Sequence, residues 1–79
     1  MYELYLLERC PYCKKVMEFM DSNNIEYLKH DIENLNEEET LIRLGGKRQV
    51  PFLYEKISGL KMYESGDIIE YLKVSNNQN

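Results

Sequence analysis

The chain has 79 residues, enough for one small domain whose hydrophobic core is marginal unless it is well packed. Hydrophobic residues make up 43% of it, which is typical of a folded globular domain and argues against a disordered one. The formal net charge of −4 argues against binding to nucleic acid or to an anionic membrane, because both need clustered cations. No apolar run approaches the ~20 residues that a membrane-spanning helix needs.

The first ten residues, MYELYLLERC, have no basic leader and include Glu3, so we expect no signal peptide and a cytoplasmic location. Thiols are kept reduced in the cytoplasm. In that compartment a lone pair of cysteines three positions apart is more typical of a redox-active or metal-binding site than of a structural disulfide.

The predicted elements alternate between strands and helices. Partly alternating apolar residues predict a strand at 2–7, and apolar residues at helical spacing predict a helix at 11–22. The remaining predicted elements, in chain order, are a strand at 25–32, a helix at 36–46, two strands at 50–55 and 60–64 joined as a hairpin around Ser58 and Gly59, and a helix at 65–74 with Ser65 as its N-cap.

This order, β-α-β-α-β-β-α, predicts an α/β domain with a four-stranded mixed sheet and three flanking helices. The first β-α-β unit should be a right-handed parallel crossover, and the hairpin should add antiparallel strands. We expect residues 1–74 to form this single domain and residues 75–79 to form a polar C-terminal tail.

The two cysteines lie in the segment RCPYCKK, residues 9–15, where the first strand gives way to the first helix. Cys10 should cap the helix, Pro11 suits its first turn, and Cys13 should lie about one turn inside. Unpaired backbone N–H groups at a helix start favour negative charge, so they should stabilise a thiolate on Cys10 and make it the nucleophile. Arg9, Lys14 and Lys15 add positive charge nearby. Cys13 points toward the core and suits the resolving role, in which it attacks a mixed disulfide on Cys10.

Two other interpretations of the cysteines stay open. A structural disulfide across two residues would close a very small loop and add little stability. A zinc site needs about four ligands, whereas the chain offers two cysteines and His30, so carboxylates or a second chain would have to complete it. The position of the pair at a strand–helix junction favours a reactive dithiol over both.

With Cys10-Pro11-Tyr12-Cys13 at that junction, the chain resembles a dithiol glutaredoxin over about residues 2–74. CPYC is characteristic of the active site of that family, whose fold is thioredoxin-like. The segment RQVPF, residues 48–52, resembles the family segment that contains a cis proline facing the active site, which would be Pro51. The segment YESGDIIEYL, residues 63–72, resembles the glutathione-binding turn and last helix of the family, and its Glu-Ser pair resembles the same turn in glutathione transferases.

The resemblance implies a set of residues around the thiols. Pro11, Tyr12, Lys14 and Pro51 would support the active site. The backbone of Val50 would pair with the cysteinyl part of glutathione, as strand edges pair with extended peptides. The remaining implied contacts to glutathione are the helix start at Ser65 and Gly66 for the γ-glutamyl carboxylate, Asp67 for the α-ammonium group, and Arg48 or Lys47 for the glycyl carboxylate.

The chain departs from the family pattern at three places. Gln49 stands where the family usually has threonine, and Leu7 where many members have a lysine. Tyr63 and Glu64 stand where a glycine pair often precedes the last helix. Leu7 removes one expected contact to glutathione, so the residues support the redox chemistry more strongly than the choice of glutathione.

The resemblance therefore implies a glutathione-dependent thiol–disulfide oxidoreductase, monomeric and without a metal, that acts on glutathionylated or disulfide-containing proteins. Neither nucleic acid nor a membrane is an expected partner. One alternative is a glutaredoxin-like redoxin that a thioredoxin reductase reduces and that donates electrons to ribonucleotide reductase. Another is a scaffold on which Cys10 and glutathione hold an iron–sulfur cluster between two chains.

Overall fold

The computed structural model describes residues 1–76, and its elements follow the predicted order. They are β1 (Tyr2–Leu6), α1 (Pro11–Ser22), β2 (Tyr27–Asp31), α2 (Leu35–Gly45), β3 (Phe52–Glu55), β4 (Leu60–Tyr63) and α3 (Ser65–Asn76). None of the helices in this part of the chain has the length and apolar character needed to cross a membrane.

The four strands form one mixed sheet in the order β2-β1-β3-β4. β1 and β2 are parallel and are joined through α1, whereas β3 is antiparallel to both β1 and β4. Gly59, in the turn between β3 and β4, has a φ of 77°, a left-handed conformation that glycine adopts at little cost. The α/β class and the four-stranded mixed sheet with three flanking helices are confirmed.

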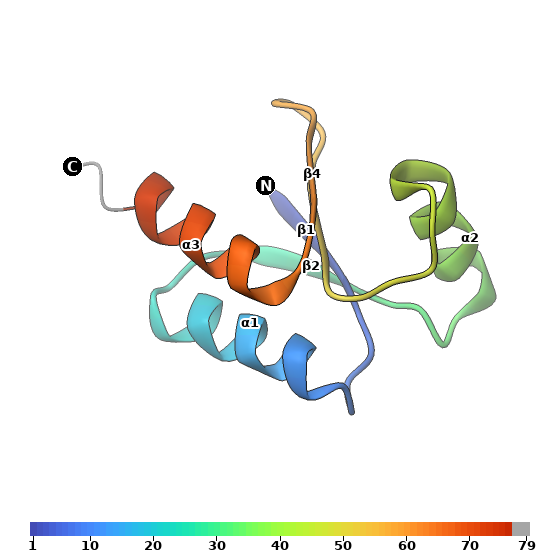
Figure 1. Cartoon of the computed structure of the whole chain (residues 1–79), viewed down its shortest axis with the longest axis horizontal. Helices are drawn as coiled ribbons and strands as arrows, with labels where there is room; N and C mark the ends of the chain where they lie inside the picture. The colour runs from blue at the N-terminus through green and yellow to red at the C-terminus, as the bar shows by residue number, and fades with distance from the viewer. Residues whose placement is uncertain (77–79) are drawn as a thin grey trace.

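The helices cover both faces of the sheet, with α1 and α3 side by side on one face and α2 on the other (Figure 1). Side chains alternate along β1, so Leu4 and Leu6 enter the core under α1 and α3 while Tyr5 enters the core under α2. Phe52 and Leu53 divide in the same way on β3. The two central strands are therefore buried on both faces, which explains their nearly continuous apolar sequences.

α2 is fixed to the sheet by polar as well as apolar contacts. Asn34 caps its start by accepting from the backbone N–H of Asn36 at 2.9 Å, and Gly46 ends it with a φ of 93°. His30 on β2 lies between two carboxylates, with 2.8 Å from Nε2 to Glu3 on β1 and 2.6 Å from Nδ1 to Glu37 on α2. His30 therefore joins three elements of the second face.

Several predicted boundaries differ from the observed ones by one or two residues; the strand predicted at 25–32, for example, spans Tyr27–Asp31. β3 begins at Phe52 rather than at 50, because Val50 and Pro51 lie in the bend that precedes the ladder. α3 continues to Asn76 instead of ending at 74, so the first two residues of the expected tail are helical, and 77–79 lie outside the described residues. Ser65 is the first helical residue and not the N-cap, since the Glu64 carbonyl already accepts from the Ile68 N–H at 2.9 Å.

Candidate active site

Cys10 lies at the N-cap of α1, as predicted, with φ and ψ of −76° and 121°. Its carbonyl accepts the first intrahelical bond, from the Lys14 N–H at 2.9 Å, and its own N–H donates to the Leu7 carbonyl at 3.0 Å. Pro11 fills the first helical position, where a missing N–H costs no hydrogen bond. The first turn of α1 contains no acidic residue. Half-buried Cys10 therefore lies at the positive end of the helix dipole, and no carboxylate in that turn reduces the positive potential.

Cys13 lies one turn further on and is buried, with 0% of its surface exposed, among Leu6, Val16 and the inner residues of α3. Burial raises the pKa of its thiol to about 12, the Leu7 backbone lowers it in part, and the hydrogen bond to Cys10 raises it again. Both cysteines are free thiols. The pair is therefore unequal: Cys13 stays protonated at neutral pH, and only Cys10 is placed to react with a partner from solution.

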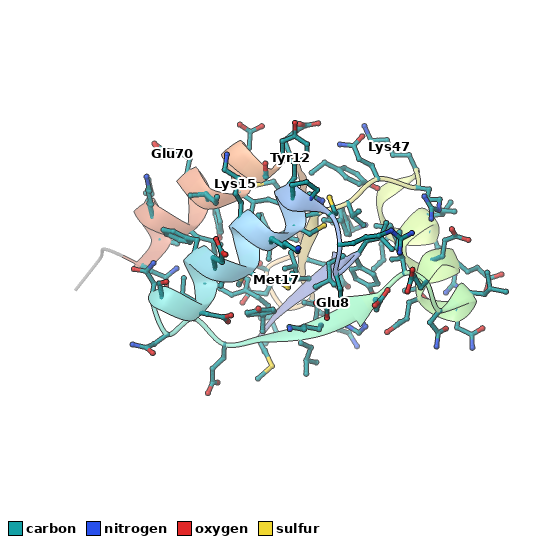
Figure 2. The ribbon with its side chains drawn as sticks, turned by 90° about the horizontal axis from the view of Figure 1, so that it is seen from below. Glu8, Tyr12, Lys15, Met17, Lys47 and Glu70 are labelled. Carbon is teal, nitrogen blue, oxygen red and sulfur yellow. The ribbon has the colours of Figure 1, made fainter. Side chains whose placement is uncertain are left out.

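A groove of about 360 Å³ runs from Tyr12, two residues after Cys10, to the start of α3. Its lining comes from three segments that are distant in sequence: Tyr12, then Gln49, Val50 and Pro51, then Glu64 and Ser65. Tyr12 is 61% exposed at the N-terminal end of α1, where Figure 2 shows its position. The Val50–Pro51 peptide bond is cis, as the resemblance implied. Tyr12 belongs to the first turn of α1, whose N-cap is Cys10, so the groove lies at the end of the helix that carries the thiol.

The start of α3 forms the far wall of the groove. Gly66 follows Ser65, and a Cβ built on it would meet nothing within 4 Å, so the protein itself does not fill this space. The unpaired backbone N–H groups of a helix start attract anions. Asp67 is exposed in the same turn. The N–H groups at this helix start could therefore bind an anionic group of a ligand, and Asp67 could bind a neighbouring cationic group of the same ligand.

The predicted cations are not in the groove lining. Arg48 forms an ion pair with Glu38 of α2, and Lys47 places its Nζ 4.8 Å from the centre of the Tyr63 ring. Arg9 likewise pairs with Glu33, which offsets part of the positive charge expected near Cys10. Exposed Lys14 follows Cys13 on α1. A role for Arg48 in binding a carboxylate stays a prediction.

Two groove residues were missed as a pair by sequence reasoning. In the sequence, Gln49 and Glu64 stand out only as departures from the family pattern. Glu64 also belongs to the Glu-Ser pair. The Gln49 amide Nε2 donates to the Glu64 carboxylate oxygen Oε2 at 2.9 Å, across 15 positions of sequence. No local signal predicts such a contact, because it depends on how the loop before β3 meets the turn before α3.

His30 has no contact in the groove lining and belongs to the opposite face of the sheet. Among residues 1–76 no group of three or more His, Cys, Asp or Glu side chains is placed to hold a metal ion. The dithiol at the start of α1 and the groove beside it therefore form the candidate active site.

This combination of fold and site is that of a thioredoxin-like dithiol protein. A thioredoxin-like protein of known structure, 24% identical, superposes with a TM-score of 0.79 over 94% of this chain and 96% of its own. Residues 4–79 match the family described as glutathione S-transferase, N-terminal domain, so the chain belongs to that family.

Among curated relatives, glutaredoxin 2 of Escherichia coli K12 is 37% identical over 70 residues, which cover 89% of this chain and 32% of that protein. The crystal structure of glutaredoxin 2 from Salmonella typhimurium in complex with glutathione is 30% identical, with a TM-score of 0.78 over 100% of this chain and 34% of that one. The chain thus spans about a third of the length of these relatives.

Proposed function

We propose that this chain is a glutathione-dependent thiol–disulfide oxidoreductase that acts through Cys10. The observation that carries the proposal is the position of half-buried Cys10 at a helix start, beside a groove whose far wall is a second helix start. Its likeness to two glutaredoxins, one of them solved with glutathione, supports the same conclusion. By this proposal the chain works in the cytoplasm and needs no metal.

The first chemical step is a thiol–disulfide exchange. The Cys10 thiolate attacks the glutathione sulfur of a protein–glutathione mixed disulfide, and the protein leaves as a thiolate that takes up a proton. Cys10 then holds the glutathionyl group. A second glutathione thiolate attacks that group, which releases oxidised glutathione and restores the Cys10 thiolate. Each exchange forms one S–S bond and breaks one, so the two electrons come from glutathione.

Cys13 supplies a second route. When Cys10 forms a mixed disulfide with a protein, the Cys13 thiol loses its proton and attacks the Cys10 sulfur, which releases the reduced protein and leaves a Cys10–Cys13 disulfide. The high pKa of Cys13 keeps it out of the first step. Disulfide-containing proteins, ribonucleotide reductase among them, are the substrate class we propose for this route.

We infer a definite order for the parts of glutathione along the groove. Val50 lines the groove, and its backbone would pair with the cysteinyl residue, which would bring the glutathione sulfur toward Cys10. The N–H groups at Ser65 and Gly66 would hold the γ-glutamyl carboxylate. Asp67 and Glu64 are the carboxylates nearest that point in the sequence, and either can accept from the α-ammonium group.

One observation favours a second candidate function. The groove lining offers no cation to the glycyl carboxylate, because Arg48 is paired with Glu38 and position 7 is leucine. A redoxin that a thioredoxin reductase reduces directly would not need that contact. It would use the same Cys10 and Cys13 chemistry with a different electron donor.

The two candidates are separated by their electron donors. NADPH consumption is measured with a glutathionylated peptide as substrate, once with glutathione and glutathione reductase and once with thioredoxin reductase alone. The proposal expects turnover with glutathione. Turnover with thioredoxin reductase alone would overturn it in favour of the redoxin.

A further inference from the structure

The hydrogen bond between Gln49 and Glu64 lies in the lining of the groove and joins two of its three segments. Gln49 is half-buried in the loop before β3, and Glu64 is exposed in the turn before α3. Both line the groove, and the 2.9 Å bond from Nε2 to Oε2 is their contact. The amide approaches a single carboxylate oxygen, which leaves Oε1 of Glu64 available to a ligand.

The backbone at Glu64 is as unusual as its side-chain contact. Its φ of 75° lies in the left-handed region, where a non-glycine residue is strained, and it is one of two such residues in the described chain. Its carbonyl starts α3 by accepting from Ile68. Glycine would perform both backbone tasks with less strain. Backbone strain of this kind is found at functional sites. The presence of glutamate rather than glycine at position 64 therefore indicates that its side chain has a function.

Tyr63 fixes the turn from the other side. Its hydroxyl donates to the Lys47 carbonyl at 2.8 Å, and its ring packs on Phe52 with 4.6 Å between centroids. The loop that holds Gln49 and the turn that holds Glu64 are thus tied together twice, once by Tyr63 and once by the Gln49–Glu64 bond. Only the second tie ends on a charged group that faces the groove.

We propose that Gln49 is a positioning residue: its amide holds the Glu64 carboxylate in the groove lining, where that carboxylate selects thiols with a γ-glutamyl ammonium group. This inference rests on the proposed function, because it assumes that glutathione occupies the groove. It assigns a task to the residue that replaces the usual threonine.

The experiment compares two substrates. One is a peptide in mixed disulfide with glutathione, and the other is the same peptide in mixed disulfide with cysteinylglycine, which lacks the γ-glutamyl residue. The KM and kcat for each are measured with the wild type, Gln49→Met, Glu64→Ala and the double variant, at saturating glutathione. Methionine keeps the length of Gln49 but cannot donate a hydrogen bond.

We expect Gln49→Met to raise the KM for the glutathionylated peptide about three- to tenfold, with kcat within about twofold, since a hydrogen bond to a charged group is lost. The KM for the cysteinylglycine peptide should not change. In the Glu64→Ala background the same substitution should add less than about twofold, because Gln49 acts through Glu64.

Three results would overturn the inference. The KM for the glutathionylated peptide could stay unchanged in Gln49→Met, it could rise equally for both peptides, or the two single effects could multiply in the double variant. The second would mean a general structural role, and the third a direct contact of Gln49 with the substrate. Failure of the proposed function is a different result, since the wild type would then show no glutathione-dependent turnover at all.

Discussion

The two halves of the site are built in different ways. The dithiol is local: Cys10 and Cys13 lie on one helix turn, and the strand end, Pro11 and the backbone around them set their geometry. The groove is assembled from three segments, around residues 12, 49–51 and 64–65, which meet only in the folded chain. The thiol chemistry can therefore survive changes that damage ligand binding, because each half of the site depends on different contacts.

The largest expected effect is on the local half. Cys10→Ser should lower glutathione-dependent turnover by more than about 100-fold, because the covalent route is lost. Initial rates with a glutathionylated peptide measure it. Cys13→Ser is the matched control and should keep turnover within about threefold of the wild type, while it loses the reduction of protein disulfides that need resolution. Equal loss in both variants would contradict the separate roles of the two thiols.

A substitution at Gly45 should disturb the groove and leave the dithiol unchanged. A Cβ there would lie 2.1 Å from the Tyr63 hydroxyl oxygen, and the Tyr63 ring is held by the Lys47 carbonyl and Phe52. Overpacking of this kind costs about 1–3 kcal/mol, so Gly45→Ala should lower the free energy of unfolding by that amount. It should also raise the KM for the glutathionylated peptide, since Tyr63 adjoins Glu64.

The control for Gly45→Ala is Gly46→Ala. Gly46 has a φ of 93° and its added Cβ would meet nothing within 4 Å, so this variant strains the backbone without reaching Tyr63. Its unfolding free energy should fall by about 1 kcal/mol, with an unchanged KM. The rate at which iodoacetamide alkylates Cys10 should equal the wild-type rate in both variants. A slower alkylation in Gly45→Ala would show that the two halves are coupled.

Loss of one carboxylate near the charged γ-glutamyl end of glutathione should have a smaller effect on the KM. Asp67→Asn removes one carboxylate from the first turn of α3, and we expect the KM for the glutathionylated peptide to rise about threefold to fivefold with kcat unchanged. Glu70→Gln, on the same helix and exposed, is the matched control and should leave the KM as it was. A KM that does not respond to Asp67→Asn would restrict recognition of the ammonium group to Glu64.

The last effect vanishes at neutral pH and appears only at alkaline pH. The folded chain holds the Cys13 proton up to a pKa of about 12, whereas the unfolded chain releases it near the ordinary value of 9.0. The stability from the buried thiol is therefore complete below about pH 9 and is lost as the pH rises from 9 to 12. Urea unfolding of the reduced wild type should show this decline, and Cys13→Ala should show a shallower one. Parallel pH profiles would contradict the burial argument.

The sequence predicted the local half well and the assembled half poorly. Helical spacing, a proline and two cysteines were enough to place the N-cap thiol and the buried one. The fold followed from the alternation of strands and helices, since parallel crossovers and hairpins have few arrangements. α3 begins at Ser65 as predicted, but its N-cap was misplaced by one residue because serine is a common N-cap, whereas here the carbonyl of Glu64, a residue with a positive φ, accepts the first intrahelical bond.

The groove depended on pairings that no local pattern encodes. Arg48 was expected near the ligand, but α2 presents Glu38 to it. Gln49 was noted as a departure from a family pattern, yet in the fold it meets Glu64. His30, which the sequence offered only as a possible zinc ligand, contacts Glu3 and Glu37 on the face opposite α1 and α3. Long-range polar contacts of this kind follow from the docking of elements.

The central claim is that Cys10 alone takes up glutathione, and intact-mass spectrometry tests it most directly. The reduced wild type, Cys10→Ser and Cys13→Ser proteins are each incubated with a glutathionylated peptide and quenched with acid. The account predicts that Cys13→Ser gains the mass of one glutathionyl group, located at Cys10 by fragmentation, and that Cys10→Ser gains none. A glutathionyl group on Cys13 in the Cys10→Ser protein, or none on Cys10 in the Cys13→Ser protein, would contradict it.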